Sequence, residues 1–265
     1  MDRVIIITGG SSGIGLAASK FFIKDGDRVY NFSRRPSPDR LAHNIKVDVS
    51  DFSQMQNAVN EVITKEGRID VLVNSAGFSL AAPLEHIERE DYKYLFDVNF
   101  FGTLDMIRLV VPHMKEQGGR IINVSSVAAL TPIAYDPYYC ASKAAINALT
   151  ESLQPELRTR GIYITSLMPG GTKTPFSYKR KIYDREESLD YYLDQTRAAD
   201  ELFKIEQEGM NAGAVAREIF NLSLFENPPI ITATGLKNKL YYHFSRIAPK
   251  KLIYSLSMKK YNQRN

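Results

Sequence analysis

The chain has 265 residues, of which 44% are hydrophobic and 24% charged, and its formal charge is +4. This is the composition of a globular protein, and such a mild charge without a recognisable binding motif gives no reason to expect a nucleic-acid partner. The single cysteine, Cys140, excludes an internal disulfide and a cysteine-rich zinc site, and we expect no metal. No apolar run approaches the roughly 18 residues of a membrane span. With a first strand expected from Arg3 and no room before it for a signal peptide, we expect a cytoplasmic protein.

Short β-branched runs alternate along the chain with longer segments of helical periodicity. The predicted strands are 3–8, 28–32, 44–49, 70–76, 120–126, 163–168 and 230–233, and the predicted helices lie near 13–25, 51–66, 88–117 and 138–160. Continuously apolar strands separated by helices indicate a parallel sheet covered on both faces. No repeat or linker marks a second domain. We therefore predict one doubly wound α/β domain over 1–265, with about seven strands.

Two late segments lie outside this alternation. Residues 175–210 contain apolar side chains at helical spacing, which predict an amphipathic helix that covers a pocket as a lid. Residues 236–265 form a basic C-terminal extension, predicted to be helical, with eight lysines and arginines and no acidic residue. This extension has three interpretations: a packed and solvated end, a surface that lies on anionic membrane, or a dock for an acidic carrier protein.

The stretch TGGSSGIG, residues 8–15, follows the first strand and leads into the first helix. Glycine tolerates positive φ and close approach of a ligand, so the stretch suggests a turn that holds a phosphate at a helix N-terminus. The spacing of Gly9, Gly13 and Gly15 differs from the general dinucleotide fingerprint. On its own, the turn could also be a tight connection without a ligand.

A second signal is YYCASK, in which Tyr139 and Lys143 are four residues apart and share one helix face. An ammonium beside a phenol stabilises the phenolate, so we expect Lys143 to lower the pKa of Tyr139 from its usual value near 10. Ser126, which ends NVSS, precedes Tyr139 by 13 residues and could hold a carbonyl oxygen. Taken singly, these are a common surface pair and a serine at the end of a strand.

In combination, the motifs resemble the short-chain dehydrogenase/reductase family in its TGxxxGxG branch, from residue 3 to about 233. The motifs are TGGSSGIG, NSAG (74–77), VNFFG (98–102), NVSS (123–126), YYCASK and MPGGTKT (168–174). The stretch from Ser125 and the basic tail look most like 17β-hydroxysteroid and retinol dehydrogenase relatives. The resemblance implies a Rossmann-type fold and an oxidoreductase that interconverts a carbonyl and an alcohol.

The resemblance also implies a role for each residue of a catalytic tetrad, Asn99, Ser126, Tyr139 and Lys143. Tyr139 would exchange a proton with the substrate oxygen, and Ser126 would orient that oxygen. Lys143 would lower the pKa of Tyr139 and hydrogen-bond the nicotinamide ribose. Asn99 would hold a water that links Lys143 to solvent.

The cofactor residues follow in the same way. The implied contacts are Gly9, Ser11, Ser12, Gly13, Ile14 and Gly15 at the pyrophosphate, Asp48, Val49, Asn74, Ala76 and Gly77 at the adenosine, Tyr139 and Lys143 at the ribose, and Pro169, Gly170, Thr172 and Thr174 at the carboxamide. Relatives that use NAD carry an acidic residue at the end of the second strand, where this chain has Ser33, Arg34 and Arg35. Guanidinium groups would bind the 2′-phosphate of NADP(H), so we predict NADP(H) over NAD(H). The arginines could otherwise be solvated loop charges.

The expected substrate is a hydrophobic alcohol or ketone of steroid, retinoid or acyl type. Its walls are predicted from Val127, Leu130, Ile133, Tyr135, Phe176, Tyr183, Tyr192 and Phe203, with few fixed charges. The alternatives are a 3-ketoacyl thioester reductase, and a sensor or scaffold that binds NADP(H) without catalysis. The family also implies a homo-oligomer, a dimer or tetramer, built on helices around 99–117 and 138–160. Cys140 is expected only to pack.

Overall fold

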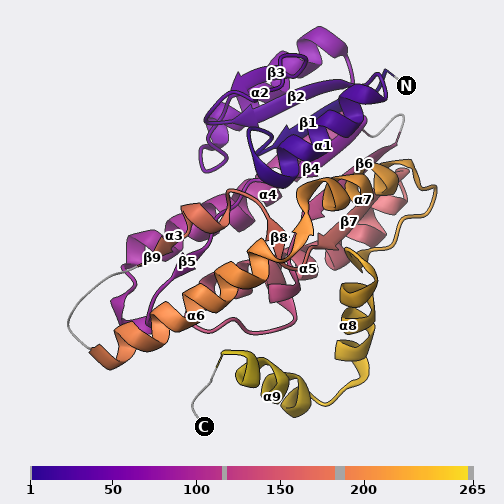
Figure 1. Ribbon diagram of the computed structural model, residues 1–265. Helices are drawn as coiled ribbons and strands as arrows, with labels where there is room; N and C mark the ends of the chain where they lie inside the picture. Colours follow the sequence, from indigo (N-terminus) through magenta and orange to yellow (C-terminus); the bar gives the residue numbers. More distant parts are fainter. Residues whose placement is uncertain (1, 115–117, 183–188, 262–265) are drawn as a thin grey trace.

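The computed structural model describes residues 2–114, 118–182 and 189–261. Its main sheet has seven strands: β1 (Val4–Thr8), β2 (Arg28–Ser33), β3 (His43–Lys46), β4 (Val71–Asn74), β6 (Gly119–Val124), β7 (Ile162–Met168) and β11 (Ile231–Ala233). All neighbouring strands pair in parallel, in the order β11-β7-β6-β4-β1-β2-β3 (Figure 1). The predicted parallel α/β fold is therefore confirmed.

The helices are α1 (Gly13–Lys24), α2 (Phe52–Glu66), α3 (Arg89–Phe96), α4 (Gly102–Val110), α5 (Pro137–Arg158), α6 (Leu189–Gln207), α7 (Ala212–Leu224), α8 (Leu236–Ile247) and α9 (Lys250–Tyr261). Shorter elements are the π-helical turn η2 (Asp97–Phe101), the 3-10 turns η1 (Leu84–His86), η3 (Val111–His113), η4 (Val127–Ala129) and η5 (Ser177–Lys179), and the two-residue strands β5 (Leu80–Ala81), β8 (Thr172–Lys173), β9 (Lys181–Ile182) and β10 (Met210–Asn211). The strand pairs β8–β10 and β5–β9 fasten the segments on either side of α6 to the rest of the chain.

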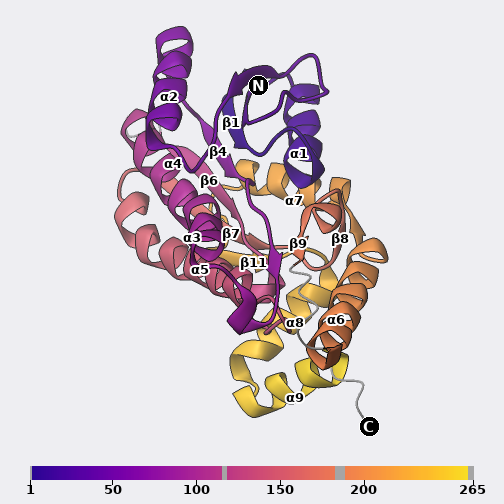
Figure 2. The same cartoon turned by 90° about the vertical axis from the view of Figure 1, so that its left-hand side faces the viewer.

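Apolar side chains on both faces of the sheet explain why helices cover both. Ile5 and Ile7 of β1 pack with Phe22 of α1 and Ile219 of α7, whereas Val4 and Ile6 face α2, α4 and α5. Figure 2 shows α1 and α7 on one side of the sheet and α2, α4 and α5 on the other. Because alternate residues of a strand point to opposite faces, an unbroken apolar run fills both cores.

The strand order places a binding crevice between β1 and β4. From β1 the chain proceeds through β2 to β3 on one side, and then from β4 through β6 and β7 to β11 on the other. Ligands of such sheets bind outside the carboxyl ends of the strands, at the point where the order reverses. The loops that follow β1, β4 and β6 therefore define the site.

Several boundaries differ from the sequence prediction. The predicted helix near 88–117 is divided into α3, the π-helical turn η2, α4 and η3, and the predicted strand 44–49 ends at Lys46. Helix α7 is absent from the prediction, although Asn211 caps it by accepting from Gly213 N. Its buried Val215, Ile219 and Leu222 follow helical spacing, so the signal was present in the sequence.

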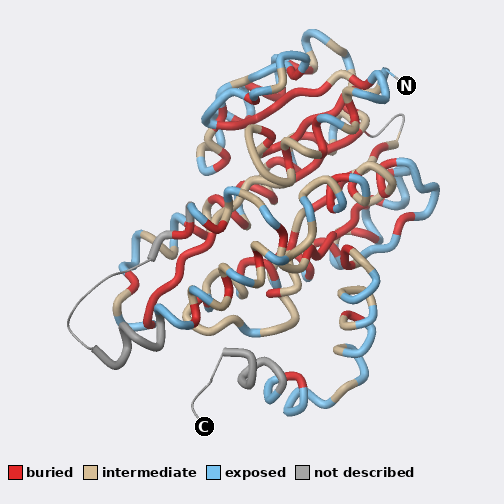
Figure 3. The backbone as a smooth tube through the Cα atoms, viewed as in Figure 1, coloured by how far each residue is buried: buried red, intermediate tan, exposed pale blue. Residues whose placement is uncertain are grey.

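The two late segments are helical, as predicted. Helix α6 lies across the molecule, and α8 and α9 extend away from the sheet at the C-terminal end (Figure 1). Figure 3 shows that the strands are mostly buried and that the described parts of α8 and α9 are largely exposed. Among the described residues, none of the helices has the length and apolar character needed to cross a membrane.

Candidate active site

One large cavity, with a volume of about 1160 Å³, opens at the carboxyl ends of the strands. Its floor begins at the turn between β1 and α1, where Gly9 and Gly13 have φ of +72° and +57°. A Cβ on Gly9 would lie 2.9 Å from the Ala76 backbone, so this turn needs glycine for its packing as well as its φ. Ser11, Ser12, Gly13 and Ile14 line the cavity, whereas Gly15 does not.

The N-terminus of α1 is built to meet an anion. Ser12 is its N-cap residue but makes no side-chain capping bond, and the first turn carries no acidic residue. Uncapped amide groups and the positive end of the helix dipole favour a phosphate here. The residues present therefore fit the pyrophosphate of a dinucleotide.

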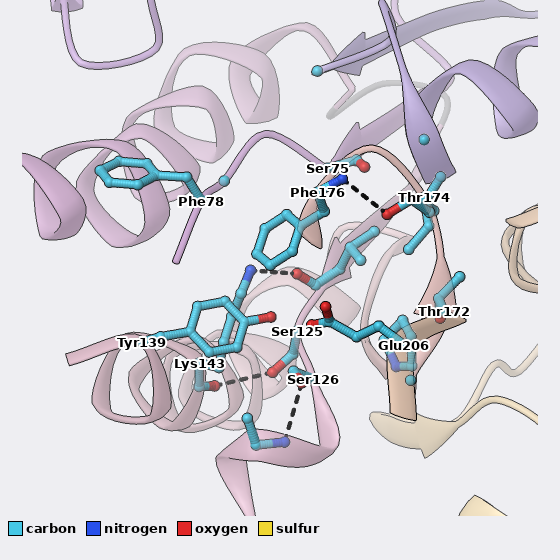
Figure 4. A pocket seen from close by; sticks show the side chains of 18 of the residues that line it. Ser75, Phe78, Ser125, Ser126, Tyr139, Lys143, Thr172, Thr174, Phe176 and Glu206 are labelled. Atoms are coloured by element: carbon cyan, nitrogen blue, oxygen red, sulfur yellow. Dashed lines mark hydrogen bonds between the residues drawn. The ribbon is translucent and has the colours of Figure 1, made fainter. Parts of the chain in front are cut away.

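Three of the four predicted catalytic residues meet in the same cavity. Ser126 follows β6 as the N-cap of η4, and its Oγ accepts from Ala128 N at 3.1 Å. Tyr139 and Lys143 come from the first turns of α5, which Pro137 begins. Figure 4 shows the Tyr139 hydroxyl directed into the cavity on the side of Ser126, with Lys143 close behind its ring.

The electrostatics of this group differ from the sequence prediction. Lys143 Nζ donates to Val124 O at 2.9 Å and lies 5.7 Å from the centroid of the Tyr139 ring. Burial lowers the pKa of Lys143 to about 8. Burial also raises the pKa of Tyr139 well above its usual 10, and a hydrogen bond with Ser126 only partly opposes this. The predicted lowering of the Tyr139 pKa was wrong for the protein alone, because burial outweighs the neighbouring polar groups.

Asn99 lies behind the cavity instead of on its wall. It sits in the π-helical turn η2, where its Oδ1 accepts from Phe78 N at 3.0 Å and its Nδ2 donates to Phe78 O at 2.9 Å. A Cβ on Gly77 would lie 3.1 Å from Asn99 Oδ1 and 3.6 Å from Lys143 Nζ. Asn99 and Lys143 therefore both lie close to Gly77. That Asn99 holds a water stays a prediction.

The adenosine end of the cavity carries the predicted arginines. Arg34 and Arg35 both line it and are exposed, and Arg34 Nη1 donates to Tyr94 OH at 3.0 Å. Arg34 also lies 3.8 Å from Asp48 Oδ2. Ser33 is buried, and its Oγ donates to Asn31 Oδ1 at 2.7 Å. No carboxylate thus occupies the end of β2, and two guanidinium groups face the cavity beside it.

The remaining predicted cofactor residues divide into two groups. Those that line the cavity are Asp48, Val49, Ala76, Gly77, Pro169, Gly170, Thr172 and Thr174. Asn74 does not line it. Its Nδ2 donates to Asn123 Oδ1 at 2.9 Å and so ties β4 to β6 inside the sheet. The prediction of a cofactor contact for Asn74 is therefore replaced by a structural role, because its side chain lies within the protein.

The predicted substrate walls are only partly correct. Val127, Ile133 and Phe176 line the cavity, but Leu130, Tyr135 and Phe203 do not. Tyr183 and the side chain of Tyr192 lie outside the described residues. Helix α8 contributes wall residues that the sequence analysis did not identify, including Asn238 and Tyr241, and Tyr241 OH hydrogen-bonds Thr131 Oγ1.

The largest omission is a buried polar chain at the substrate end. Ser79 Oγ donates to Asp136 Oδ2 at 2.6 Å and accepts from Arg180 Nε at 2.9 Å. Arg180 Nη2 donates to Glu206 Oε1, also at 2.6 Å. Asp136, Arg180 and Glu206 all line the cavity, so the expectation of few fixed charges was wrong. Their positions in the sequence are far apart, so no local motif could reveal them.

Burial raises the pKa of the Asp136 carboxyl to about 7, and the hydrogen bond from Ser79 and the charge of Arg180 oppose this shift. Burial also raises the pKa of the Cys140 thiol to about 12. Cys140 does not line the cavity, which agrees with a packing role. Among the described residues, none of the groups of His, Cys, Asp and Glu could hold a metal ion.

Comparison with known proteins adds to this geometry. The family model described as short chain dehydrogenase matches residues 3–182. The 3-ketodihydrosphingosine reductase of Bacteroides thetaiotaomicron is 32% identical over 236 residues, which are 88% of each chain. The 3-oxoacyl-[acyl-carrier-protein] reductase of Thermotoga maritima is 35% identical over 199 residues, covering 71% of this chain and 81% of the relative.

Solved structures of the same fold are also similar to this chain. A short-chain dehydrogenase from Streptomyces avermitilis has a TM-score of 0.80 and 28% identity, with 93% of each chain covered. ElxO with NADP bound has a TM-score of 0.72 and 27% identity, covering 88% of this chain and 97% of ElxO. The likeness extends over nearly the whole chain in each case.

Proposed function

The chain belongs to the short-chain dehydrogenase family, and from that premise we propose that it is an NADP(H)-dependent carbonyl reductase or alcohol dehydrogenase that acts on a hydrophobic substrate. The observation that carries this proposal is the meeting of Ser126, Tyr139 and Lys143 in one cavity with the glycine turn at the N-terminus of α1. A protein that only binds a dinucleotide has no need for the serine and the tyrosine together.

The cofactor would supply or accept the hydride, and the chain's own residues would handle the proton. The raised pKa of Tyr139 keeps its phenol protonated at neutral pH, as proton donation to a carbonyl oxygen requires. Ser126 lies beside this hydroxyl and would hold the same oxygen. The ammonium of Lys143 lies behind the tyrosine ring and would stabilise the phenolate left after proton transfer.

The positive charge at the adenosine end of the cavity supports the proposal that the cofactor is NADP(H). Arg34 and Arg35 reach the cavity, and β2 ends in Ser33 without a carboxylate that would repel a 2′-phosphate. Solved neighbours include one complex with NADP and one with NAD, so the arginines carry this part of the proposal.

The substrate is proposed to be a ketone or alcohol with an apolar chain. Val127, Ile133 and Phe176 give the cavity apolar walls. The two relatives described above are named for reduction of 3-ketodihydrosphingosine and of a 3-oxoacyl group on a carrier protein. These names favour an acyl-type substrate over the steroid and retinoid types.

Two partner proposals go with this function. A homo-oligomer would use the surfaces of α4 and α5, beside Phe101, the last residue of η2, which is 47% exposed. Exposed apolar residues on α8 and α9 beside lysines and arginines would bring the enzyme to anionic membrane, where lipophilic substrates reside.

The testing experiment is NADPH consumption against a panel of carbonyls, with Tyr139→Phe as control. The panel runs from short 3-ketoacyl thioesters through long-chain ketones to retinal and ketosteroids. We expect turnover with acyl-type ketones and a loss of at least about 100-fold in Tyr139→Phe, because general-acid catalysis contributes this much, with NADPH binding retained. Tight NADPH binding without turnover of any carbonyl would contradict the reductase and favour a sensor.

A further inference from the structure

A carboxylate at the substrate end of the cavity has one oxygen without a partner. Glu206, near the end of α6, is 9% exposed, and its Oε1 accepts from Arg180 Nη2. Its Oε2 is buried and accepts no hydrogen bond from the residues that the structure describes. Leaving a buried carboxylate oxygen unpaired costs free energy. A ligand in the cavity that donates a hydrogen bond to this oxygen would remove that cost.

The position of Glu206 relates that atom to the reaction. Figure 4 shows its carboxylate directed into the cavity, on the side where the Tyr139 hydroxyl and Ser126 lie. After burial and the neighbouring Asp136, the charge of Glu206 contributes to the raised pKa of Tyr139, so the two side chains interact electrostatically. A group bound to Glu206 would therefore lie on the same side of the cavity as the carbonyl that Tyr139 and Ser126 hold.

The guanidinium of Arg180, which faces the same part of the cavity, already has two hydrogen-bond partners. Arg180 already donates to both Ser79 and Glu206, and Asp136 lies on the other side of Ser79. Lys143 is held by Val124 O behind the Tyr139 ring. An anionic group would meet two carboxyl groups here, whereas a donor would complete the bonding of Glu206.

We propose that Glu206 Oε2 binds an N–H or O–H donor on the substrate carbon next to the reacting carbonyl, so that the preferred substrates are α-amino or α-hydroxy ketones with an apolar chain. This inference rests on the proposed reductase function. An ammonium is the stronger ligand of the two, because its hydrogen bond to a carboxylate is assisted by both charges.

Glu206→Gln is a sharp test because Arg180 determines how the amide is oriented. Arg180 has only donors, so the amide oxygen must face it and the amide nitrogen must replace Oε2. The variant keeps the bond that holds α6 but presents a donor where the wild type presents an acceptor. Glu201→Gln, on the same helix and away from the cavity, is the matched control for loss of charge.

The experiment compares kcat/KM for ketones of one chain length whose α carbon carries an amino group, a hydroxyl group, a methyl group or only hydrogen. We expect the amino and hydroxy ketones to exceed the methyl ketone by about 10- to 100-fold in the wild type and in Glu201→Gln. In Glu206→Gln this ratio, which compares substrates within one variant, should fall to near one. Equal kcat/KM for all four ketones in the wild type, or a preference that survives in Glu206→Gln, would overturn the proposal.

Binding separates this inference from the proposed function. Calorimetric titration with an α-amino alcohol and its deamino analogue, in the presence of NADPH, needs no turnover. A preference of the wild type for the amino compound that disappears in Glu206→Gln supports the site even if no ketone is reduced, in which case only the reductase proposal fails. Equal affinity of the wild type for both compounds contradicts the site.

Discussion

At the scale of single residues, the proposed preference for NADP(H) depends on Arg34, which follows β2. Arg34 is mostly exposed and donates to Tyr94 OH, and it lies near Asp48, which weakens its net charge only slightly because solvent screens the pair. Its guanidinium is thus available for a phosphate at the adenosine end. A carboxylate at the same place would instead accept from ribose hydroxyls and repel a 2′-phosphate.

We therefore expect Arg34→Asp to reverse the cofactor preference. Loss of one charge-assisted contact and gain of a repulsion should lower kcat/KM for NADPH by about 10- to 100-fold and raise that for NADH. Steady-state kinetics with both cofactors measure this ratio. Arg40→Asp, an exposed arginine away from the main cavity, should leave it unchanged. An unaltered ratio in Arg34→Asp would refute the assignment of NADP(H).

At the scale of elements, a polar chain joins α5, which carries Tyr139, to α6, which lines the cavity. Asp136 is the N-cap residue of α5, three residues before Tyr139, and Ser79 and Arg180 connect it to Glu206 of α6. Asp136 is buried within this chain of hydrogen bonds, and its burial opposes ionisation and raises the pKa of its carboxyl group. Stability and pH are linked through this group.

Because the pKa of Asp136 is raised in the folded protein, we expect its contribution to lower the free energy of unfolding as the pH rises from about 4 to about 7. Its folded pKa of about 7 lies above the unfolded value near 3.9, so in this window the folded state binds more protons than the unfolded state. Asp136→Asn removes the titration while its amide oxygen still accepts from Ser79. Denaturant unfolding at pH 5 and pH 8 should give a difference that is smaller in Asp136→Asn than in the wild type. If the free energy of unfolding differs between pH 5 and pH 8 by the same amount in Asp136→Asn as in the wild type, groups other than Asp136 produce the difference.

At the scale of the whole molecule, the C-terminal helices present a surface that the core does not use. Leu236, Leu240 and Ile247 are 75%, 62% and 85% exposed, and Lys250 and Lys251 follow them without acidic neighbours. Apolar side chains beside basic ones suit insertion into the interface of an anionic membrane. Helix α8 also forms part of the cavity wall, so binding through α8 would bring the cavity near that membrane.

We expect the protein to sediment with vesicles that contain anionic lipid and to remain in solution with neutral vesicles. Added salt should weaken binding, because the charged part of the attraction is screened. Ile247→Asp should reduce the bound fraction, whereas Leu41→Asp, which alters an apolar residue 72% exposed elsewhere, should not. Equal binding to neutral vesicles, or none to either, would contradict a membrane role for α8 and α9.

The sequence alone determined the main features of the fold and indicated the residues that are proposed to be catalytic. Short, β-branched apolar runs that alternate with helical segments indicate strands covered on both faces, and β1, β2, β4, β6 and β7 follow from this pattern. Tyr139, Lys143 and Ser126 were identified through the resemblance of the combined motifs to a known family, and the structure brings the three residues to one cavity. Helix α7 could have been predicted from its apolar spacing and its cap at Asn211.

Only the tertiary structure decided which polar groups share the substrate end. Asp136, Arg180 and Glu206 are separated by tens of residues, and the packing of α5, α6 and the intervening loops brings them together. The tertiary structure also shows that Asn74, which was predicted to contact the cofactor, bonds Asn123 between two strands. Burial raises the pKa of Tyr139, whereas the sequence predicted that it would be lowered. Local sequence fixes secondary structure and motif chemistry, whereas burial and long-range neighbours exist only once the chain has folded.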